Sequence, residues 1–210
     1  MEPRIAQDTA DFRELREKGY IYVDKTEQLY RLANGIDIGG KLFFISRPRR
    51  FGKSLMLSTL ECIFRGQRDL FKGLAIDKLD YDWAEYPVLH FNFAGLKVET
   101  LETFKIDFRS RVKETLGKAG CGWSDADFPG TNFSRAINTL AMASKQKSVV
   151  VLIDEYDAPV GHTLNDIKLA TAIRQELSDF YIQIKNNAAA IRFMMMTGVT
   201  KFTQLSVFSA

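Results

Sequence analysis

A segment that begins as an apolar run and ends in Gly-Lys-Ser places the strongest constraint on the fold of this chain. Residues 41–46 (KLFFIS) have the composition of a buried strand, and a short loop leads from them into Gly52-Lys53-Ser54. From Gly52 to Arg65 the apolar residues follow helical spacing. A Gly-Lys-Ser tripeptide between a strand and a helix is typical of a phosphate-binding loop, because the first N–H groups and the dipole of the helix attract anions.

The loop departs from the usual phosphate-binding pattern at two positions. Arg47 stands where a glycine is expected, and Pro48 removes one N–H donor. We therefore expect a poorer backbone cradle, in which the guanidinium groups of Arg49 and Arg50 supply charge. The alternative is that both arginines are simply solvated.

The candidate phosphate ligands follow directly from this loop. Lys53 is expected to reach the β and γ phosphates of a nucleotide, and the Ser54 hydroxyl is a candidate Mg²⁺ ligand. The full predicted set is Arg49, Arg50, Phe51, Gly52, Lys53, Ser54 and Leu55.

A second signal comes from the apolar run 149–153 (VVVLI), which ends in Asp154-Glu155. In enzymes with a phosphate-binding loop, an Asp at a strand end holds Mg²⁺, here Asp154, and a neighbouring Glu polarises the attacking water, here Glu155. The alternative is a buried strand that ends in solvated acids. The two signals in this order predict a P-loop NTPase fold.

Strands and helices are expected to alternate along the chain, which predicts an α/β fold, a three-layer αβα sandwich around a parallel sheet. Expected strands lie at 41–46, 88–93, 149–153 and 191–196, and expected helices at 12–20, 26–33, 52–65, 99–118, 133–144 and 164–185. One strand between the phosphate loop and the acidic strand is typical of the additional-strand class of P-loop ATPases. Its strand order is 5-1-4-3-2, with the ligand at the carboxyl ends of strands 1 and 3.

In that order the strand 191–196 lies beside the first strand, and the polar residues after it face the γ-phosphate. Thr197 is the candidate sensor and third catalytic residue, with Thr200 and Lys201 as further candidates. A simple turn at Thr197-Gly198 is the alternative.

Three weaker candidates remain open. Tyr22 or Lys25 is a possible nucleotide contact, although Asp24 and Thr26 favour a plain helix cap. Asp157 either helps to hold the Mg²⁺ waters or is a solvated loop acid. His162 is more typical of a surface loop than of a catalytic site.

Composition limits the remaining function classes. The 210 residues carry a net charge of only +3, which gives little support to a non-specific nucleic-acid binder. Two cysteines do not make a disulfide framework. No apolar run approaches the roughly 18 residues of a membrane span, so no membrane partner is expected and the cytoplasm is the expected location.

Four motifs together resemble the AAA-ATPase-like domain family of bacterial proteins: 20–26 (YIYVDKT), 46–55 (SRPRRFGKSL), 152–157 (LIDEYD) and 197–202 (TGVTKF). The segments 70–74 (LFKGL) and 83–88 (WAEYPV) are similar to its connecting motifs. The resemblance covers nearly the whole chain. It implies one domain over 1–210, with a lead-in at 1–40 and a core at 41–205, and it makes the Arg-rich loop a family version of the phosphate loop.

The resemblance further implies binding of ATP with Mg²⁺. Many relatives continue into a helical lid and a nuclease-like domain of the PD-(D/E)xK type, so the chain is expected to be incomplete at its C-terminus. The leading hypothesis is an ATPase that regulates an attached effector domain. The alternatives are a nucleotide-binding switch without turnover and a DNA-associated module. The expected partners are a nucleotide, a second copy of the chain in a homo-oligomer, and nucleic acid bound through the missing C-terminal domain.

Overall fold

A single parallel sheet of four strands forms the centre of the computed structural model, which describes residues 4–6, 9–36 and 39–200. The order across the sheet is β1-β4-β3-β2, as predicted for these four strands. The bounds are β1 Leu42–Ser46, β2 Val88–Asn92, β3 Val149–Asp154 and β4 Ile191–Gly198.

The parallel register brings the carboxyl ends of all four strands to one edge of the sheet. Ser46 pairs with Gly198 across β1 and β4, and Asn92 pairs with Asp154 across β2 and β3. The polar residues that follow the strands therefore meet at this edge, which is where ligands bind in open α/β sheets.

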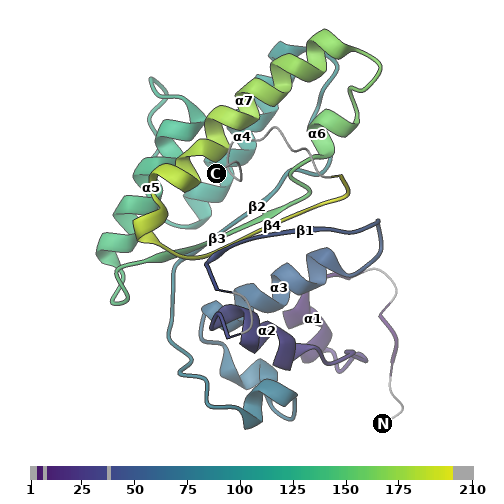
Figure 1. Ribbon diagram of the computed structural model, residues 1–210, viewed down its shortest axis with the longest axis vertical. Coiled ribbons are helices and arrows are strands. Elements are labelled where there is room, and N and C mark those ends of the chain that lie inside the picture. The colour runs from purple at the N-terminus through teal and green to yellow at the C-terminus, as the bar shows by residue number, and fades with distance from the viewer. Residues whose placement is uncertain (1–3, 7–8, 37–38, 201–210) are drawn as a thin grey trace.

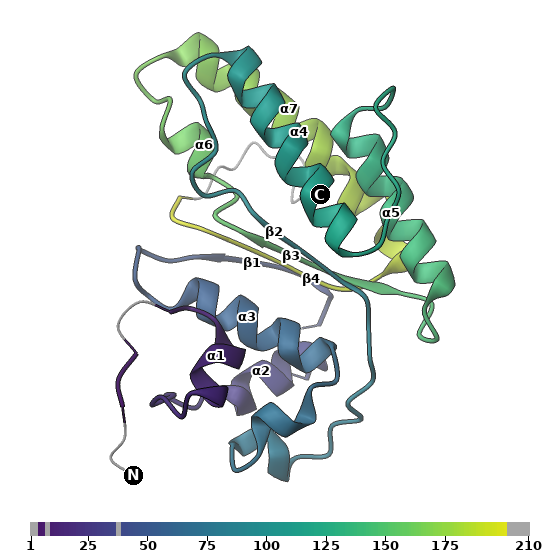
Figure 2. The same cartoon turned by 180° about the vertical axis from the view of Figure 1, so that it is seen from behind.

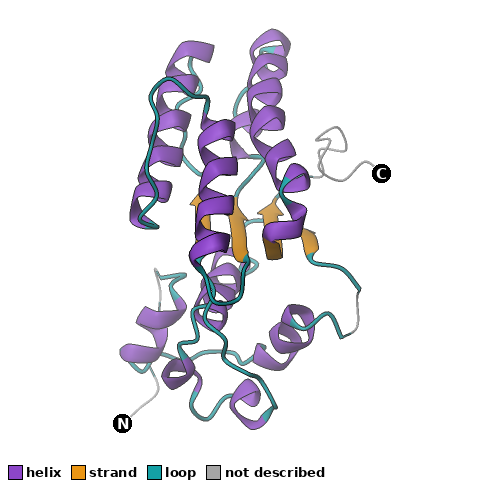
Figure 3. Cartoon of the chain, turned by 90° about the vertical axis from the view of Figure 1, so that its left-hand side faces the viewer, coloured by secondary structure: helices purple, strands orange, loops and turns teal. Residues whose placement is uncertain are grey.

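Helices cover both faces of the sheet, so the predicted three layers are present (Figures 1 and 2). One face carries α1 Phe12–Glu17, α2 Thr26–Ala33 and α3 Lys53–Phe64, with the 3₁₀ helices η1 Arg68–Phe71 and η2 Ala75–Lys78. The other carries α4 Leu101–Lys118, α5 Pro129–Ala143 and α7 Ile167–Asn186. The short α6 Ala158–Gly161 follows β3, and η3 Ala188–Ala190 precedes β4. Figure 3 shows the strands as one layer between the helices.

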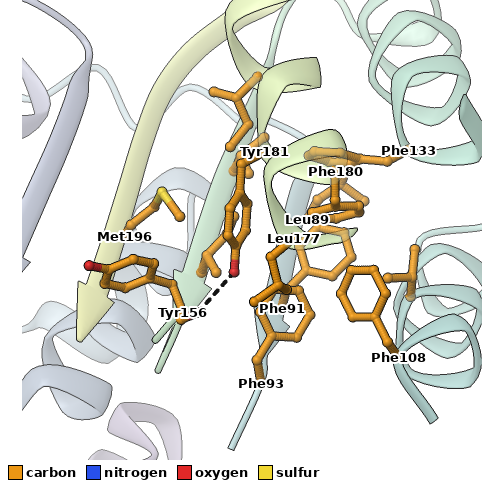
Figure 4. Packing of buried hydrophobic residues seen from close by; sticks show 14 of the residues in the cluster. Leu89, Phe91, Phe93, Phe108, Phe133, Tyr156, Leu177, Phe180, Tyr181 and Met196 are labelled. Carbon is orange, nitrogen blue, oxygen red and sulfur yellow. Dashed lines mark hydrogen bonds between the residues drawn. The ribbon is translucent and has the colours of Figure 1, made fainter. Parts of the chain in front are cut away.

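The strands are buried on both faces, so successive side chains enter two different cores. Val151 and Met194 pack toward α4, α5 and α7, whereas Leu152 and Met195 pack toward α3. The first core is rich in phenylalanine (Figure 4), and Phe180 stacks on Phe133 at 4.5 Å between ring centroids. Close aromatic packing on this face gives the sheet a rigid support.

Several helix boundaries differ from the expectation, and two helix starts differ by three or four residues for a visible reason. α5 begins at Pro129 rather than at 133, because a proline is well accommodated in the first turn, where its missing N–H has no partner to lose. α7 begins at Ile167 rather than at 164, because Asp166 caps it by accepting a 3.0 Å hydrogen bond from the Leu169 N–H. The 3₁₀ helices and α6 were not predicted, since such short pieces carry little periodicity.

Candidate nucleotide site at the carboxyl edge of the sheet

The loop 47–52 joins β1 to α3 and leaves the first turn of that helix without a side-chain cap. Gly52 is the N-cap residue, with a left-handed φ of +73°, and it has no side chain to accept from the helix N–H groups. Arg50 is also left-handed, with φ +66°. Left-handed residues within a turn curl successive N–H groups into a concave surface that suits an anion. The two left-handed residues are compatible with such a surface despite the substitutions at Arg47 and Pro48, and phosphate binding by the loop stays a prediction.

Lys53 is the most unusual residue of this loop. Its side chain is buried, with 6% of the residue exposed, and Nζ donates to the carbonyl oxygens of Arg47 at 2.9 Å and Pro48 at 3.0 Å. Among the residues that the structure describes, no carboxylate lies within ion-pairing distance of Nζ. A buried ammonium normally has an anionic partner, so this lysine suits an incoming anion.

The other predicted phosphate ligands surround Lys53. Arg49, Arg50 and Phe51 are exposed, and Ser54 and Leu55 are half-buried in the first turn of α3. The exposure of the two arginines is compatible with both interpretations of them. Their contact with phosphate stays a prediction.

The end of β3 is built differently, because its aspartate is buried. Asp154 is only 2% exposed, and its Oδ1 accepts from the Thr197 hydroxyl and from the Glu155 N–H at 3.1 Å. The interpretation of Asp154 as a solvated strand-end acid is therefore wrong. Thr197 is fully buried within β4, so the alternative of a simple turn at Thr197-Gly198 is wrong as well.

Glu155 is half-buried and has a left-handed backbone, with φ +50°. This conformation is strained for a residue with a Cβ, by about 1–2 kcal/mol. Such strain persists only where the surroundings hold it, and it is concentrated at functional sites. The geometry is compatible with the predicted role of Glu155 in polarising water, and that role stays a prediction.

Asp157 is also buried, at 5% exposed, so its interpretation as a solvated loop acid is wrong. Its Oδ2 accepts three hydrogen bonds from the chain after β4: from the N–H of Val199 at 2.8 Å, and from the N–H and hydroxyl of Thr200 at 2.6 and 2.7 Å. The candidate sensor Thr200 thus bonds to Asp157. Lys201, the other candidate, lies outside the described residues.

A cavity of about 450 Å³ opens beside the phosphate loop. Its lining includes Lys53 and both candidates for a nucleotide contact, Tyr22 and Lys25. Burial raises the pKa of Tyr22, which keeps its phenol neutral. The lining residues are Ile21, Tyr22, Val23, Lys25, Gln28, Leu29, Ile45, Arg47, Phe51, Gly52, Lys53, Leu55 and Met56.

Asp24 and Thr26 hold the wall of this cavity. Asp24 Oδ1 accepts from the Thr26 N–H and hydroxyl, at 2.8 and 2.7 Å, and Oδ2 accepts from the Ala75 N–H at 2.7 Å. Thr26 in turn accepts from the Ile76 N–H at 3.0 Å. Both residues therefore have a structural role, but the expectation that they cap α2 is wrong, because the N-cap residue is Lys25 and no side chain makes a cap hydrogen bond there.

Sequence reasoning missed the part that α2 plays in the cavity. Gln28 and Leu29 line the cavity because α2 packs beside the phosphate loop. No local sequence pattern predicts that packing. The close approach of Gly198 to the end of β3 was missed as well. A Cβ built on Gly198 would lie 2.4 Å from Tyr156 Cε1 and 2.6 Å from Asp157 Oδ1.

The remaining polar candidates do not join the site. His162 is exposed just after α6, as expected for a surface residue. Within the described part of the chain no group of three or more His, Cys, Asp or Glu is placed to hold a metal ion by itself. None of the described helices combines the length and apolar character needed to cross a bilayer.

Comparisons with known proteins place the chain in one family. A family model described as a predicted AAA-ATPase matches residues 7–208. A protein of Azotobacter chroococcum mcd 1, described as an uncharacterized protein in the vnfD 5′ region, is 36% identical over 202 residues. The alignment covers 94% of this chain and 37% of that relative, so the chain spans little more than a third of the relative's length. No solved structure matches significantly. The chain therefore belongs to the AAA-ATPase-like family.

Proposed function

We propose that the chain is an ATP-binding module of the additional-strand P-loop class that hydrolyses ATP in the presence of Mg²⁺. The observation that carries this proposal is Lys53, a buried ammonium that bonds to backbone carbonyls at the uncapped start of α3. A phosphate chain supplies the missing negative charge and accepts from the free helix N–H groups. The place of β4 between β1 and the acidic strand β3 supports the class.

The residues of the phosphate loop bind different parts of the phosphate chain. The N–H groups from Gly52 to Leu55 and the Lys53 ammonium hold the β and γ phosphates, and Arg49 and Arg50 add charge at the rim. The base lies in the adjoining cavity, against Tyr22 and Lys25. Its largely apolar lining suits a flat heterocycle with a few polar edge contacts.

Mg²⁺ fits the oxygen donors at this edge, the Ser54 hydroxyl and the Asp154 carboxylate. When bound, the ion neutralises charge that develops on the β and γ phosphates. Asp154 is oriented for this role by the Thr197 hydroxyl, which fixes one carboxylate oxygen. Thr197 also lies where it can respond to the γ-phosphate through the same carboxylate.

Glu155 orients the attacking water. The water oxygen bonds to the γ-phosphorus, the bond from that phosphorus to the ADP oxygen breaks, and ADP, phosphate and a proton leave. We further propose that this cycle regulates an effector domain, since the matched relative is much longer than this chain.

The first test is calorimetric titration of ATP with Mg²⁺ into the wild-type chain and into Lys53→Ala. We expect the substitution to weaken binding by about 100-fold, which is the loss of a strong charge-assisted contact. Lys168→Ala, an exposed change on α7, is the matched control and should bind normally. Equal binding by wild type and Lys53→Ala would disprove the assignment of the loop.

A second test separates turnover from binding. Glu155→Gln should still bind ATP and should lose most hydrolysis, because the amide cannot act as a base. A wild-type chain that binds ATP without releasing phosphate would instead favour the nucleotide-binding switch.

A further inference from the structure

The ends of β3 and β4 are joined by a group of hydrogen bonds around Asp157. We call Asp157, Val199 and Thr200 the clasp. Three donors from Val199 and Thr200 converge on Asp157 Oδ2, at 2.8, 2.6 and 2.7 Å. The neighbouring Tyr156 reinforces it, since its hydroxyl donates to the Thr200 carbonyl at 2.7 Å.

The position of Asp157 makes this arrangement unusual. Asp157 is the N-cap residue of α6, where an aspartate ordinarily accepts from the N–H groups of its own helix. In this protein the side chain makes no cap hydrogen bond to α6, and the carboxylate instead accepts from the chain that follows β4. A buried carboxylate that satisfies three donors of another segment is a strong local constraint.

Glu155 lies between two anchored neighbours. On one side Asp154 is tied to β4 through Thr197 and accepts from the Glu155 N–H. On the other side the Tyr156 N–H donates to the Thr197 carbonyl at 3.1 Å, and Asp157 is held by the clasp. The strained left-handed backbone of Glu155 is therefore fixed from both ends.

We propose that Asp157 is a positioning residue for ATP hydrolysis, acting through the clasp to hold Glu155 and Thr197 in place at the γ-phosphate. The inference rests on the proposed function. It assigns Asp157 no contact with nucleotide or metal. Within the described part of the chain, the Asp157 carboxylate bonds to the segment after β4 and not to the phosphate loop. The backbone beside the clasp also accepts from the start of the loop, at the Val199 carbonyl from the Ser46 hydroxyl at 2.8 Å and at the Gly198 carbonyl from the Arg47 N–H at 3.1 Å. These two bonds do not involve Asp157, so removal of its carboxylate should slow turnover while leaving nucleotide affinity intact.

The test compares Asp157→Ala, Asp157→Asn and the wild type for ATP affinity and for kcat. An amide oxygen accepts the same three hydrogen bonds, so Asp157→Asn should keep kcat within about threefold. Asp157→Ala should lower kcat by about tenfold or more, the size expected when a catalytic group is displaced, with Kd changed by less than about threefold. Asp166→Ala is the matched control, because it removes the cap of α7 and touches neither strand end. It should leave kcat unchanged.

A second measurement protects the test against a variant that does not fold. Thr200→Val removes one donor of the clasp and keeps both backbone donors. It should lower kcat by about two- to threefold with normal ATP binding. Hydrogen exchange at the Val199 and Thr200 amides should be slow in the wild type and in Asp157→Asn, and faster in Asp157→Ala.

The outcomes distinguish the inference from the function beneath it. If the wild type hydrolyses ATP and Asp157→Ala keeps its kcat, the inference alone is overturned. The inference is also overturned if ATP affinity and kcat fall together in Asp157→Ala. It is overturned as well if Asp157→Asn is as slow as Asp157→Ala, because the charge of the carboxylate then matters rather than its hydrogen bonds. A wild type that binds no ATP overturns the proposed function and the inference together, and one that binds without hydrolysis overturns the positioning role.

Discussion

The two halves of the candidate site are built in opposite ways. The phosphate loop is exposed from Arg47 to Gly52, and its lysine bonds to carbonyl oxygens of the same loop. The end of β3 is buried, and its aspartates Asp154 and Asp157 bond to side chains and backbone of β4 and the chain after it.

The proposed function gives this difference a physical reason. Phosphate binding needs N–H groups and charges that the ligand can reach, so the loop must stay open. Hydrolysis needs groups held within a fraction of an ångström, so the acidic end must be fixed before the ligand arrives. We therefore expect substitutions in the loop to change binding at little cost in stability, and substitutions at the β3–β4 end to cost stability as well.

The largest expected effect contrasts two glycines, one from each half. Gly198→Ala should lower the free energy of unfolding by about 3 kcal/mol, because its Cβ collides with Tyr156 and Asp157. Gly52→Ala should cost only about 1 kcal/mol, because a Cβ there meets open space and only the left-handed backbone is strained. Urea unfolding of both variants measures the difference. Equal losses would contradict the comparison.

The next effect contrasts two tyrosine hydroxyls. Tyr181 is fully buried and donates to the Tyr156 carbonyl at 3.1 Å, as the dashed line in Figure 4 shows. Tyr181→Phe removes this buried hydrogen bond and should cost about 1.5 kcal/mol. Tyr30→Phe, which removes an exposed 3.3 Å bond to the Asp80 carbonyl, should cost less than about 0.5 kcal/mol. Thermal unfolding distinguishes the two, and similar losses would show that the β3 end is not specially rigid.

A smaller effect tests the strain at Glu155. Glu155→Gly should be more stable than Glu155→Ala by about 1 kcal/mol, the reverse of the usual order, because glycine accepts a left-handed φ without strain. Both variants should lose hydrolysis. Denaturant titration gives the stability order. An alanine variant as stable as the glycine variant would mean that Glu155 is unstrained.

The smallest effect concerns the wall of the binding half. Burial raises the pKa of the Asp24 carboxyl, but hydrogen bonds from Thr26 and Ala75 outweigh it and hold the pKa below its usual value near 3.8. The stability from these bonds is fully present above the usual pKa, and it is lost as pH falls through the lower folded value. Asp24 is partly exposed to solvent, so this stability is below about 1 kcal/mol.

Unfolding of wild type and Asp24→Ala at about pH 6 and about pH 3 checks the sign. The stability difference between the two chains should shrink in acid. A difference that stays constant over that range would mean that the carboxylate charge contributes nothing to the wall.

Much of the fold and of the candidate site could be predicted because it depends on local sequence patterns. Apolar runs marked the four strands. The candidate site residues were predicted from their place in the chain: Lys53 and Ser54 follow the loop after the first strand, and Asp154 and Glu155 stand at the end of the third. Parallel strands bring their carboxyl ends to one edge, so these residues were expected to lie near that edge, and the predicted order of the four strands was confirmed.

Other features were decided only by the tertiary structure. The burial of Asp157 and its bonds to Thr200 join residues 43 positions apart, and the bond between Thr197 and Asp154 spans the same separation. The cavity likewise needs α2 to pack beside the phosphate loop. No local pattern reports contacts over such distances. The sequence by itself therefore determined which strands end at this edge and which polar residues accompany those ends. Packing decided which of these residues are exposed and which are buried and hydrogen-bonded.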